Sequence, residues 1–349
     1  MKKNNIILAD TKVPNDWEFA EGLKKKTEKE WIIKDWDNAG IKTNCLFYIR
    51  KIGGYFSHSF SVFLNRKKYY SIVSWQQFYG ILLAFYCTVF HVKKTFNLTI
   101  MTFIYKDKKG FLGKIYKRVI KRVLKSKYVD SVIVYSKNEP KVYSDILEVP
   151  EELFSYLPLG ISSKKELGET ERVLPDRFIL SVGRSNRDYD FLFKCVKDLP
   201  YEFVVLTDEL TEKAIPRNVT LYSDVRGDEY LKILQKCEIV AITLKDGNIS
   251  SGQLVMLQAM AYEKPLIITE AKSINEYVKD GINALIRKKE KNEFSNGIKT
   301  LMEDENLRKR LTEAGCDIYT ERHSLVKLGE SVGTIQESIW RENESSSNN

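Results

Sequence analysis

Residues 177–286 alternate between short apolar runs and amphipathic segments, and this alternation constrains the fold more than any other feature of the chain. The apolar runs have the length of buried strands and lie at 177–183, 203–208, 219–222, 239–244, 265–269 and 284–286. Helical periods lie between them, at 189–198, 228–237, 253–262 and 274–278. Strands that alternate with helices across short loops form a parallel, doubly wound sheet. Such a sheet binds ligands beyond the carboxyl ends of its strands, so we expect the site there.

The first half of the chain alternates in the same way, with less regular spacing. The expected strands are 6–10, 70–75, 98–105, 131–135 and 156–159, and the expected helices are 78–90, 111–126 and 140–147. The sequence therefore predicts an α/β fold with two Rossmann-like domains in tandem. Residues 305–340 are expected to be helical. We expect an N-terminal domain over 1–160, a C-terminal domain over 161–322, a helix over 323–340 that packs back on the N-terminal domain, and a disordered tail over 341–349.

Composition and cysteine usage exclude several other classes of protein. With 43% hydrophobic and 30% charged residues, the chain has a globular composition and not a disordered one. Its five cysteines include no Cys-x-x-Cys pair, which argues against a zinc knuckle or a disulfide framework and fits a reducing cytoplasm. The longest apolar stretch, 78–92, is shorter than the roughly 20 residues that a membrane span needs, so a buried helix is expected there.

Charge is distributed unevenly between the two halves. Residues 1–160 hold 28 Lys and Arg against 15 Asp and Glu, whereas the remainder holds 28 against 32. The first half is therefore strongly basic and the second mildly acidic. This asymmetry predicts that only the first domain meets an anionic partner.

Residues 248–261 carry the most informative motif. A strand ends near residue 244, a polar loop containing Gly252 follows, and a helix begins. Free backbone N–H groups at a helix start, together with the helix dipole, form an anion site. Ser250 or Ser251 is a candidate cap for this helix, and Gln258 lies about two turns further along it, so that both ends of the motif can face one ligand. The alternative is an ordinary strand-to-helix turn with a serine cap.

A second motif, at 181–188, follows the first strand of the same domain. Gly183 permits close approach of a backbone, and Arg184 and Arg187 are three residues apart, where both can bind phosphate oxygens. Each arginine taken alone is equally compatible with a solvated surface position. Because both follow a strand at the same edge of the sheet as the first motif, the pair favours a pyrophosphate clamp.

These segments resemble a known family of enzymes. The donor-binding segment of glycosyltransferase family 4 is similar to the run SSGQLVMLQAMAYEKPLIITEAKSINEYVKDGINALI of this chain. The strand and phosphate loop that open the C-terminal domain of that family resemble FILSVGRSNRDYDFL, and its linker resembles SYLPLGI. The resemblance implies a GT-B fold, in which two Rossmann-like domains face each other across a cleft, and transfer with retention of anomeric configuration. The donor-binding residues that it implies are Gly183, Arg184, Arg187, Ser250, Ser251, Gly252, Gln253, Leu254, Gln258 and Glu276.

The chain departs from the family pattern at three positions. Tyr189 stands where the family usually has a lysine, and Ser250 and Gln258 stand where it often has a pair of glutamates. Gln258 can still hydrogen-bond ribose hydroxyls, because an amide offers both a donor and an acceptor. Ser250 cannot replace a carboxylate that stabilises positive charge near the sugar. The departures therefore affect the details of sugar recognition.

Residues 106–127 form a basic loop and helix with ten cations and one acid, Asp107. An apolar stripe that includes Phe111, Leu112 and Ile115 runs between the cations. This pattern fits a helix that lies on an anionic leaflet, one that grips a polyprenyl-diphosphate acceptor, or one that packs on its sheet with a solvated cationic face. Nucleic acid is not expected, because no recognised RNA or DNA motif is present. The candidate contacts are Lys106, Lys109, Lys114, Lys117, Arg118, Lys121 and Arg122.

Other cleft candidates in the first half are the glycine-rich loop at Gly53 and Gly54 and the strand end at Trp75 and Gln76. No histidine follows the expected strand 98–105, where the family usually places one, and no general base is identified. No Asp-x-Asp pair directly follows one of the strands expected above, so neither a metal ion nor another cofactor is expected, and arginine with a helix N-terminus would stabilise the leaving nucleotide.

The leading hypothesis is a cytoplasmic glycosyltransferase, peripherally associated with the inner face of the cell membrane. It would move a sugar from a UDP- or GDP-sugar to a saccharide or a polyprenyl-diphosphate-linked acceptor during synthesis of O-antigen, capsule or exopolysaccharide. A non-catalytic binding protein on a GT-B scaffold is the first alternative, and a basic nucleic-acid-binding protein is the second.

Overall fold

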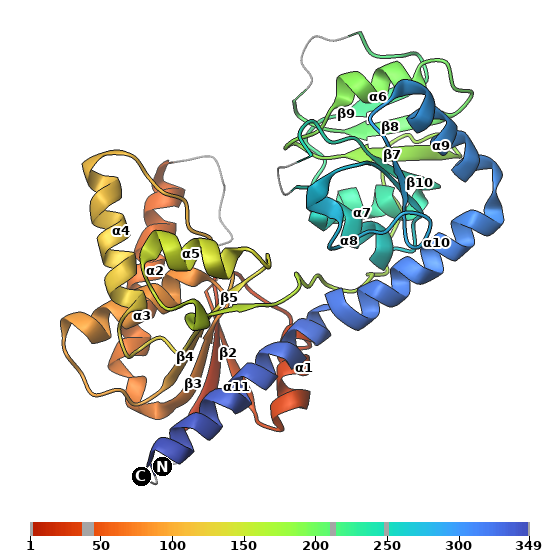
Figure 1. Ribbon diagram of the computed structural model, residues 1–349. Helices are drawn as coiled ribbons and strands as arrows, with labels where there is room; N and C mark the ends of the chain where they lie inside the picture. The colour runs from red at the N-terminus through yellow and green to blue at the C-terminus, as the bar shows by residue number, and fades with distance from the viewer. Residues whose placement is uncertain (1–2, 37–44, 210–213, 248–250, 348–349) are drawn as a thin grey trace. The chain divides into compact units, whose positions relative to one another are not determined.

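The computed structural model describes residues 3–36, 45–209, 214–247 and 251–347 of the chain. These residues form two compact units (Figure 1). Unit 1 comprises residues 1–160 and 325–349, and unit 2 comprises residues 161–324. Each unit is built around its own parallel six-stranded sheet. Across the described residues, no helix is both long and apolar enough to cross a bilayer.

The sheet of unit 1 has the strand order β2-β1-β3-β4-β5-β6. Its strands are β1 (Asn4–Ala9), β2 (Trp31–Asp35), β3 (Tyr69–Ser74), β4 (Asn97–Ile100), β5 (Ser131–Val134) and β6 (Phe154–Tyr156). The crossover helices are α1 (Glu18–Thr27), α2 (Cys45–Leu64), α3 (Gln77–Val89), α4 (Gly110–Leu124) and α5 (Glu139–Leu147). Every neighbouring pair of strands runs parallel.

The inner strands of this sheet are buried on both faces, which explains why they are mostly apolar and carry only small or uncharged polar residues between the apolar ones. In β1 the side chains of Ile6 and Leu8 enter a core shared with α2, α3, α4 and α5. Ile7, on the opposite face, enters a second core with α1 and the C-terminal helix α11 (Leu325–Ser347). Successive strand residues point to opposite faces, so one short run supplies both cores.

Helix α11 packs along α1 within unit 1. Glycines allow the two helices to approach closely, because a Cβ atom at Gly22 would lie 2.0 Å from the carbonyl oxygen of Val326 and one at Gly329 would lie 2.2 Å from that of Phe19. Lys25 of α1 pairs with Glu330 of α11 at 2.8 Å. The helix continues to Ser347, so the expected helix end at residue 340 is too early.

The sheet of unit 2 has the order β12-β11-β10-β7-β8-β9. Its strands are β7 (Phe178–Val182), β8 (Glu202–Leu206), β9 (Val219–Tyr222), β10 (Ile239–Ile242), β11 (Leu266–Thr269) and β12 (Leu285–Arg287). Helices α6 (Tyr189–Val196), α9 (Lys291–Glu303) and α10 (Glu305–Ile318) share the core on one face. Helices α7 (Gly227–Lys236) and α8 (Gln253–Ala261) lie on the opposite side of the sheet (Figure 1).

The expected alternation of strands and helices is confirmed, but several expected elements differ from the structure. The expected helix at 274–278 is absent from the described structure, where only the 3-10 turn η3 (Lys272–Ile274) forms. The expected strand 98–105 ends at Ile100, and residues after it form the loop that leads to α4. Helices α1, α2 and α9 and strand β2 were not foreseen.

Candidate functional site

A pocket of about 740 Å³ opens in unit 2 at the carboxyl ends of β7 and β8. The N-termini of α7 and α8 both contribute to its wall, through Gly227 and Asp228 and through Gly252 to Leu254. The first turn of a helix leaves backbone N–H groups without intrahelical partners, and the helix dipole adds partial positive charge there. Two such ends beside one pocket favour an anionic ligand.

The guanidinium of Arg187 lies buried in the wall of this pocket, and the residue is only 8% exposed. Its Nε donates to the carbonyl of Val182 at 3.0 Å and its Nη1 donates to that of Ser185 at 3.1 Å. Gly183 has φ +140°, and a Cβ atom there would lie 2.6 Å from Nε of Arg187. A Cβ atom at Gly252 would lie 3.5 Å from Nη2 of the same side chain. Glycines therefore flank the guanidinium where the two loops meet.

Arg187 has no carboxylate partner within the part of the chain that the structure describes. Burial lowers the pKa of its guanidinium from the usual value, because an apolar surrounding disfavours the charged form. Two carbonyl oxygens satisfy some of its donors without neutralising its charge. Glu209 also acts on this guanidinium through its charge, but no carboxylate among the described residues lies within ion-pair distance of it. The buried cation at the pocket wall can therefore bind an anion.

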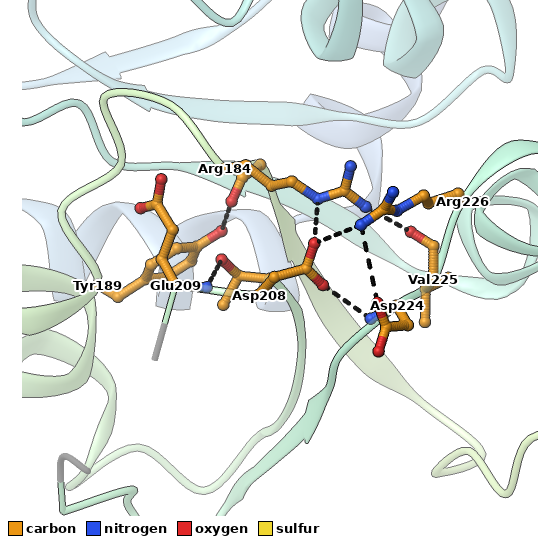
Figure 2. A network of polar contacts seen from close by, with 9 residues as sticks. Arg184, Tyr189, Asp208, Glu209, Asp224, Val225 and Arg226 are labelled. Atoms are coloured by element: carbon orange, nitrogen blue, oxygen red, sulfur yellow. Dashed lines mark hydrogen bonds and ion pairs between the residues drawn. The ribbon is translucent and has the colours of Figure 1, made fainter. Parts of the chain in front are cut away.

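Arg184, in contrast, is 44% exposed and already paired (Figure 2). Its Nε lies 2.6 Å from Oδ2 of Asp208, and its Nη2 donates to the carbonyl of Val225 at 3.2 Å. The same Oδ2 accepts from Nη2 of Arg226 at 2.9 Å, and Oδ1 accepts from the backbone N–H of Asp224 at 2.7 Å. The carboxylate thus joins the loops that follow β7, β8 and β9.

Asp208 is held in its ionised form by these contacts. The backbone N–H of Asp224 is the largest influence that lowers the pKa of the carboxyl group, and Arg226 and Arg184 lower it further. Arg184 and Arg226 both line the pocket, so one carboxylate positions two guanidinium groups at its wall.

The loops that follow β7 and β10 are joined through Asn186, which has φ +56°. Its Nδ2 donates to the carbonyl of Asp246 at 2.8 Å and to Oγ of Ser251 at 2.9 Å, while its Oδ1 accepts from the N–H of Asp246 at 2.8 Å. The expectation that Ser251 caps the helix was wrong: the N-cap of α8 is Gly252, at φ +87° and without a side-chain cap. Ser250 lies outside the described residues.

Two further polar groups in the pocket wall are buried and have no hydrogen-bond partner among the described residues. They are Oε1 of Gln258 on α8 and the hydroxyl of Tyr230 on α7. Burial raises the pKa of the Tyr230 hydroxyl, so it stays protonated and able to donate. A buried polar atom without a partner costs free energy, which a polar ligand in the pocket would recover.

Some of the remaining residues expected to bind the donor line the pocket, and others do not. Gln253 and Leu254 line the pocket, and Leu254 is 53% exposed. Glu276 is not among the residues that line it. Tyr189, which replaces the lysine of the family pattern, is buried, and its hydroxyl donates to the carbonyl of Gly183 at 2.6 Å. Tyr189 therefore supports the loop from behind, and burial raises the pKa of its hydroxyl to about 12.

The four residues of unit 1 that were expected to border a cleft lie inside a helix, in the core or at a helix cap. Gly53 and Gly54 lie inside helix α2, so the expected glycine-rich loop was wrong. The ring of Trp75 packs edge-on against Trp17 at 4.8 Å in the core beside α1. The side chain of Gln76 caps α3 by accepting from the N–H of Phe78 at 2.7 Å.

The cations of the basic segment are mostly exposed. Lys106, Lys109, Lys114, Arg118 and Arg122 are exposed, whereas Lys117 and Lys121 are half-buried. Lys121 forms an ion pair with Glu148. The inner side of α4 packs on the sheet through Ile120, Val123 and Leu124, while Phe111 and Leu112 at its first turn are 77% and 79% exposed. The apolar stripe is therefore buried only in the second half of the helix.

Asp208, Arg226, Asn186 and Tyr230 were missed by the sequence analysis. Asp208 follows a strand at the carboxyl edge of the sheet, and Arg226 directly precedes a helix, so both positions carried a usable signal. Asn186 lay within the motif at 181–188 but was not recognised as the residue that joins the loops. For Tyr230 no signal was available, because only packing decides which side of α7 faces the pocket.

Comparison with known proteins agrees with this fold. The two Rossmann-like units, each built on a parallel six-stranded sheet, define a GT-B fold, and the pocket lies at the strand ends of the second unit. Residues 164–317, which contain the pocket, match the family model of glycosyl transferases group 1.

An uncharacterized glycosyltransferase of Methanocaldococcus jannaschii is 26% identical over 173 residues, which are 46% of this chain and 48% of that relative. The match thus spans about half the length of that protein. The structure of Anabaena HepE in complex with UDP-glucose is similar with a TM-score of 0.60 and 14% identity, over 96% of this chain and 99% of that one. Sucrose-phosphate synthase from Thermosynechococcus elongatus is similar with a TM-score of 0.63 and 14% identity, over 97% and 100%.

Proposed function

We propose that the chain is a glycosyltransferase that binds a nucleotide-sugar donor in the pocket of unit 2. The observation that carries this proposal is the buried guanidinium of Arg187, which lies between two glycines and lacks a described carboxylate partner. The N-termini of α7 and α8 line the same pocket, so a diphosphate there meets a cation and free N–H groups together. The complex of Anabaena HepE with UDP-glucose supports a UDP-sugar donor, and a GDP-sugar remains the alternative.

In the proposed reaction the bond between the sugar C1 and the diphosphate oxygen breaks, and C1 forms a bond to an acceptor hydroxyl oxygen. The hydroxyl proton passes to solvent water, and the nucleoside diphosphate departs with the electron pair of the broken bond. Negative charge therefore develops on the diphosphate. Arg187, positioned by Val182 and Ser185, and Arg184, positioned by Asp208, stabilise that charge in this proposal without a bound metal ion or other cofactor.

The acceptor and the location are part of the same proposal. A basic unit 1 with exposed cations on α4 suits a polyprenyl-diphosphate-linked or saccharide acceptor at an anionic membrane surface. We propose that the chain works peripherally at the cytoplasmic face of the membrane, in synthesis of a cell-surface polysaccharide. Retention of anomeric configuration follows from the resemblance to glycosyltransferase family 4.

Calorimetric titration with UDP and with GDP tests the donor site. The purified chain should bind one of them saturably, and Arg187→Gln should weaken that binding by a factor on the order of one hundred, as expected for a charged contact worth about 3 kcal/mol. Arg177→Gln is the matched control, because Arg177 is exposed and pairs with Glu238 away from the pocket. Equal binding by both variants would reject the site, provided that thermal unfolding shows both to be folded.

Transfer itself is tested with Arg184→Ala and with a chelator. In this proposal Arg184→Ala abolishes sugar transfer and leaves the fold intact, whereas EDTA leaves transfer unchanged. Normal transfer by Arg184→Ala would remove that residue from the phosphate clamp. Loss of transfer in EDTA with recovery by a divalent cation would overturn metal independence.

A non-catalytic nucleotide-binding protein on the same scaffold is the second candidate. It is favoured by Gln258 and Ser250, which stand where glycosyltransferase family 4 often has glutamates. Saturable UDP or GDP binding without hydrolysis or transfer across UDP-, GDP- and dTDP-sugars would support this candidate over the first.

A further inference from the structure

Helix α2 presents an uncharged, largely apolar face to the outside of unit 1. Between Ile52 and Leu64, a stretch that the structure describes in full, the exposed positions are 52, 53, 56, 57, 60, 61 and 64. Four of them carry large apolar side chains: Ile52, Phe56, Phe60 and Leu64, which are 54%, 49%, 40% and 62% exposed. The other three are glycine or serine. A helix at a protein surface normally turns charged residues outward, whereas this exposed face carries no charged side chain.

The apolar surface continues onto the end of α3. Val89 and Phe90 are 47% and 59% exposed. The ring of Phe63 stacks on Phe60 with centroids 5.8 Å apart and on Phe90 at 5.4 Å, which joins the two helices in one aromatic cluster. We name this surface, formed by Ile52, Phe56, Phe60, Leu64, Val89 and Phe90, the α2 face. Contiguous exposed apolar side chains of this kind mark a docking surface.

The charge of the chain segment that contains the α2 face favours one kind of partner. Residues 45–129, which contain α2, α3 and α4, hold 17 Lys and Arg and a single acid, Asp107. Two copies of such a basic surface repel each other, so a second copy of this chain is disfavoured. An anionic phospholipid surface offers both the negative charge and the apolar interior that the α2 face and its basic surroundings complement.

We propose that the α2 face inserts its apolar side chains into an anionic phospholipid bilayer. The inference deepens the membrane association proposed above and rests on that part of the proposed function. The exposed cations of α4 supply a long-range attraction that salt screens. The α2 face supplies burial of apolar surface, which salt does not screen, and it therefore holds the chain at the membrane when electrostatic attraction is weak.

The experiment is co-sedimentation with vesicles of phosphatidylcholine and phosphatidylglycerol in equal amounts. The double variant Ile52→Gln/Phe56→Gln keeps helix-forming residues and removes two exposed apolar side chains. Its matched control is Val142→Gln/Val173→Gln, which removes two exposed apolar side chains outside the α2 face. The α2 variant should bind vesicles at least about tenfold more weakly than the wild type, and the control should match the wild type. At about 1 M salt the wild type should retain binding that the α2 variant has lost.

Hydrogen exchange of the wild-type chain gives a readout that does not depend on how the variant folds. On the mixed vesicles, backbone amides of residues 50–64 should gain protection, whereas those of α1 should not. Equal vesicle binding by the α2 variant and its control, or unchanged exchange in residues 50–64, would overturn the inference. If the double substitution instead dissolves a concentration-dependent dimer and leaves vesicle binding intact, the α2 face binds a second copy and the inference is wrong.

Failure of the separate proposals can be told apart. Absence of vesicle binding by the wild-type chain would reject both the α2 inference and the proposed membrane association. Nucleotide binding in unit 2 is measured separately by calorimetry, so the vesicle experiment neither supports nor rejects it.

Discussion

Nε of Arg184 lies 2.6 Å from Oδ2 of Asp208, and that carboxylate also binds Arg226 (Figure 2). The contact joins the loop after β7 to the loop after β8, and Arg226 adds the loop after β9. Arg184 is therefore not a freely mobile cation. Its position at the pocket wall depends on an acidic residue that follows a different strand.

Substitution of Asp208 by Asn should weaken nucleotide binding on the order of tenfold, about 1.4 kcal/mol. An amide keeps the shape but has no charge, so it no longer holds two guanidinium groups. Asp224→Asn is the control, since Asp224 is 82% exposed at its side chain and contacts Arg226 only at 3.7 Å. Calorimetric titration of both variants checks this prediction; equal affinities would mean that Asp208 does not position the arginines.

The lowered pKa of Asp208 predicts how the same contact responds to acid. A carboxyl whose pKa is lower in the folded than in the unfolded chain stabilises the fold above its unfolded value, about 3.9, and loses that contribution as the pH falls through the folded value. The difference in unfolding free energy between the wild type and Asp208→Asn should therefore be constant above about pH 5 and shrink below about pH 4. Denaturant unfolding at a series of pH values measures this difference. A difference that grows on acidification would contradict the assignment.

Substitution of Gly183 by Ala should abolish nucleotide binding, because the new Cβ atom would displace the Arg187 guanidinium. Gly281→Ala separates this effect from backbone strain: Gly281 also has a positive φ, +67°, but a Cβ atom there meets nothing within 4 Å. Gly281→Ala should lower the free energy of unfolding by about 1 kcal/mol through backbone strain, and Gly183→Ala should lower it further because it also displaces a buried side chain. Only Gly183→Ala should lose binding. Thermal unfolding and calorimetry on the two variants decide the matter; retained binding by Gly183→Ala would show that Arg187 tolerates displacement.

Substitution of Gln258 by Met should separate binding from stability. Oε1 of Gln258 is buried and has no partner in the part of the chain that the structure describes, so its removal should leave the unfolding free energy unchanged or raise it by about 1 kcal/mol. Nucleotide affinity should fall roughly tenfold if that oxygen accepts from the ligand. Gln235→Met on α7 is the comparison, because Nε2 of Gln235 already donates to the carbonyl of Leu167. Unchanged affinity of the Gln258 variant would exclude the oxygen from ligand binding.

The parallel α/β architecture and the strand ends that carry the pocket can be predicted from the order of the residues alone. Buried parallel strands need uninterrupted apolar runs, and glycine and arginine directly after such a run can be read from the chain. The sequence also indicated that Gly183, Arg187 and Gly252 belong to one site, since parallel strands end at the same edge of a sheet. Residues 51–55 misled the interpretation, because Gly53 and Gly54 read as a loop while packing of α2 on α3 keeps them helical.

Only the tertiary structure decided which arginine is buried and which is paired. Arg184 and Arg187 are alike as residues, and their difference arises from Asp208, 24 positions further along, and from the close approach of Gly252. The tertiary structure also decided that α2 turns phenylalanines outward. Hydrophobic periodicity shows that a helix has an apolar face, but when nearly every face is apolar, packing alone selects the one that remains exposed.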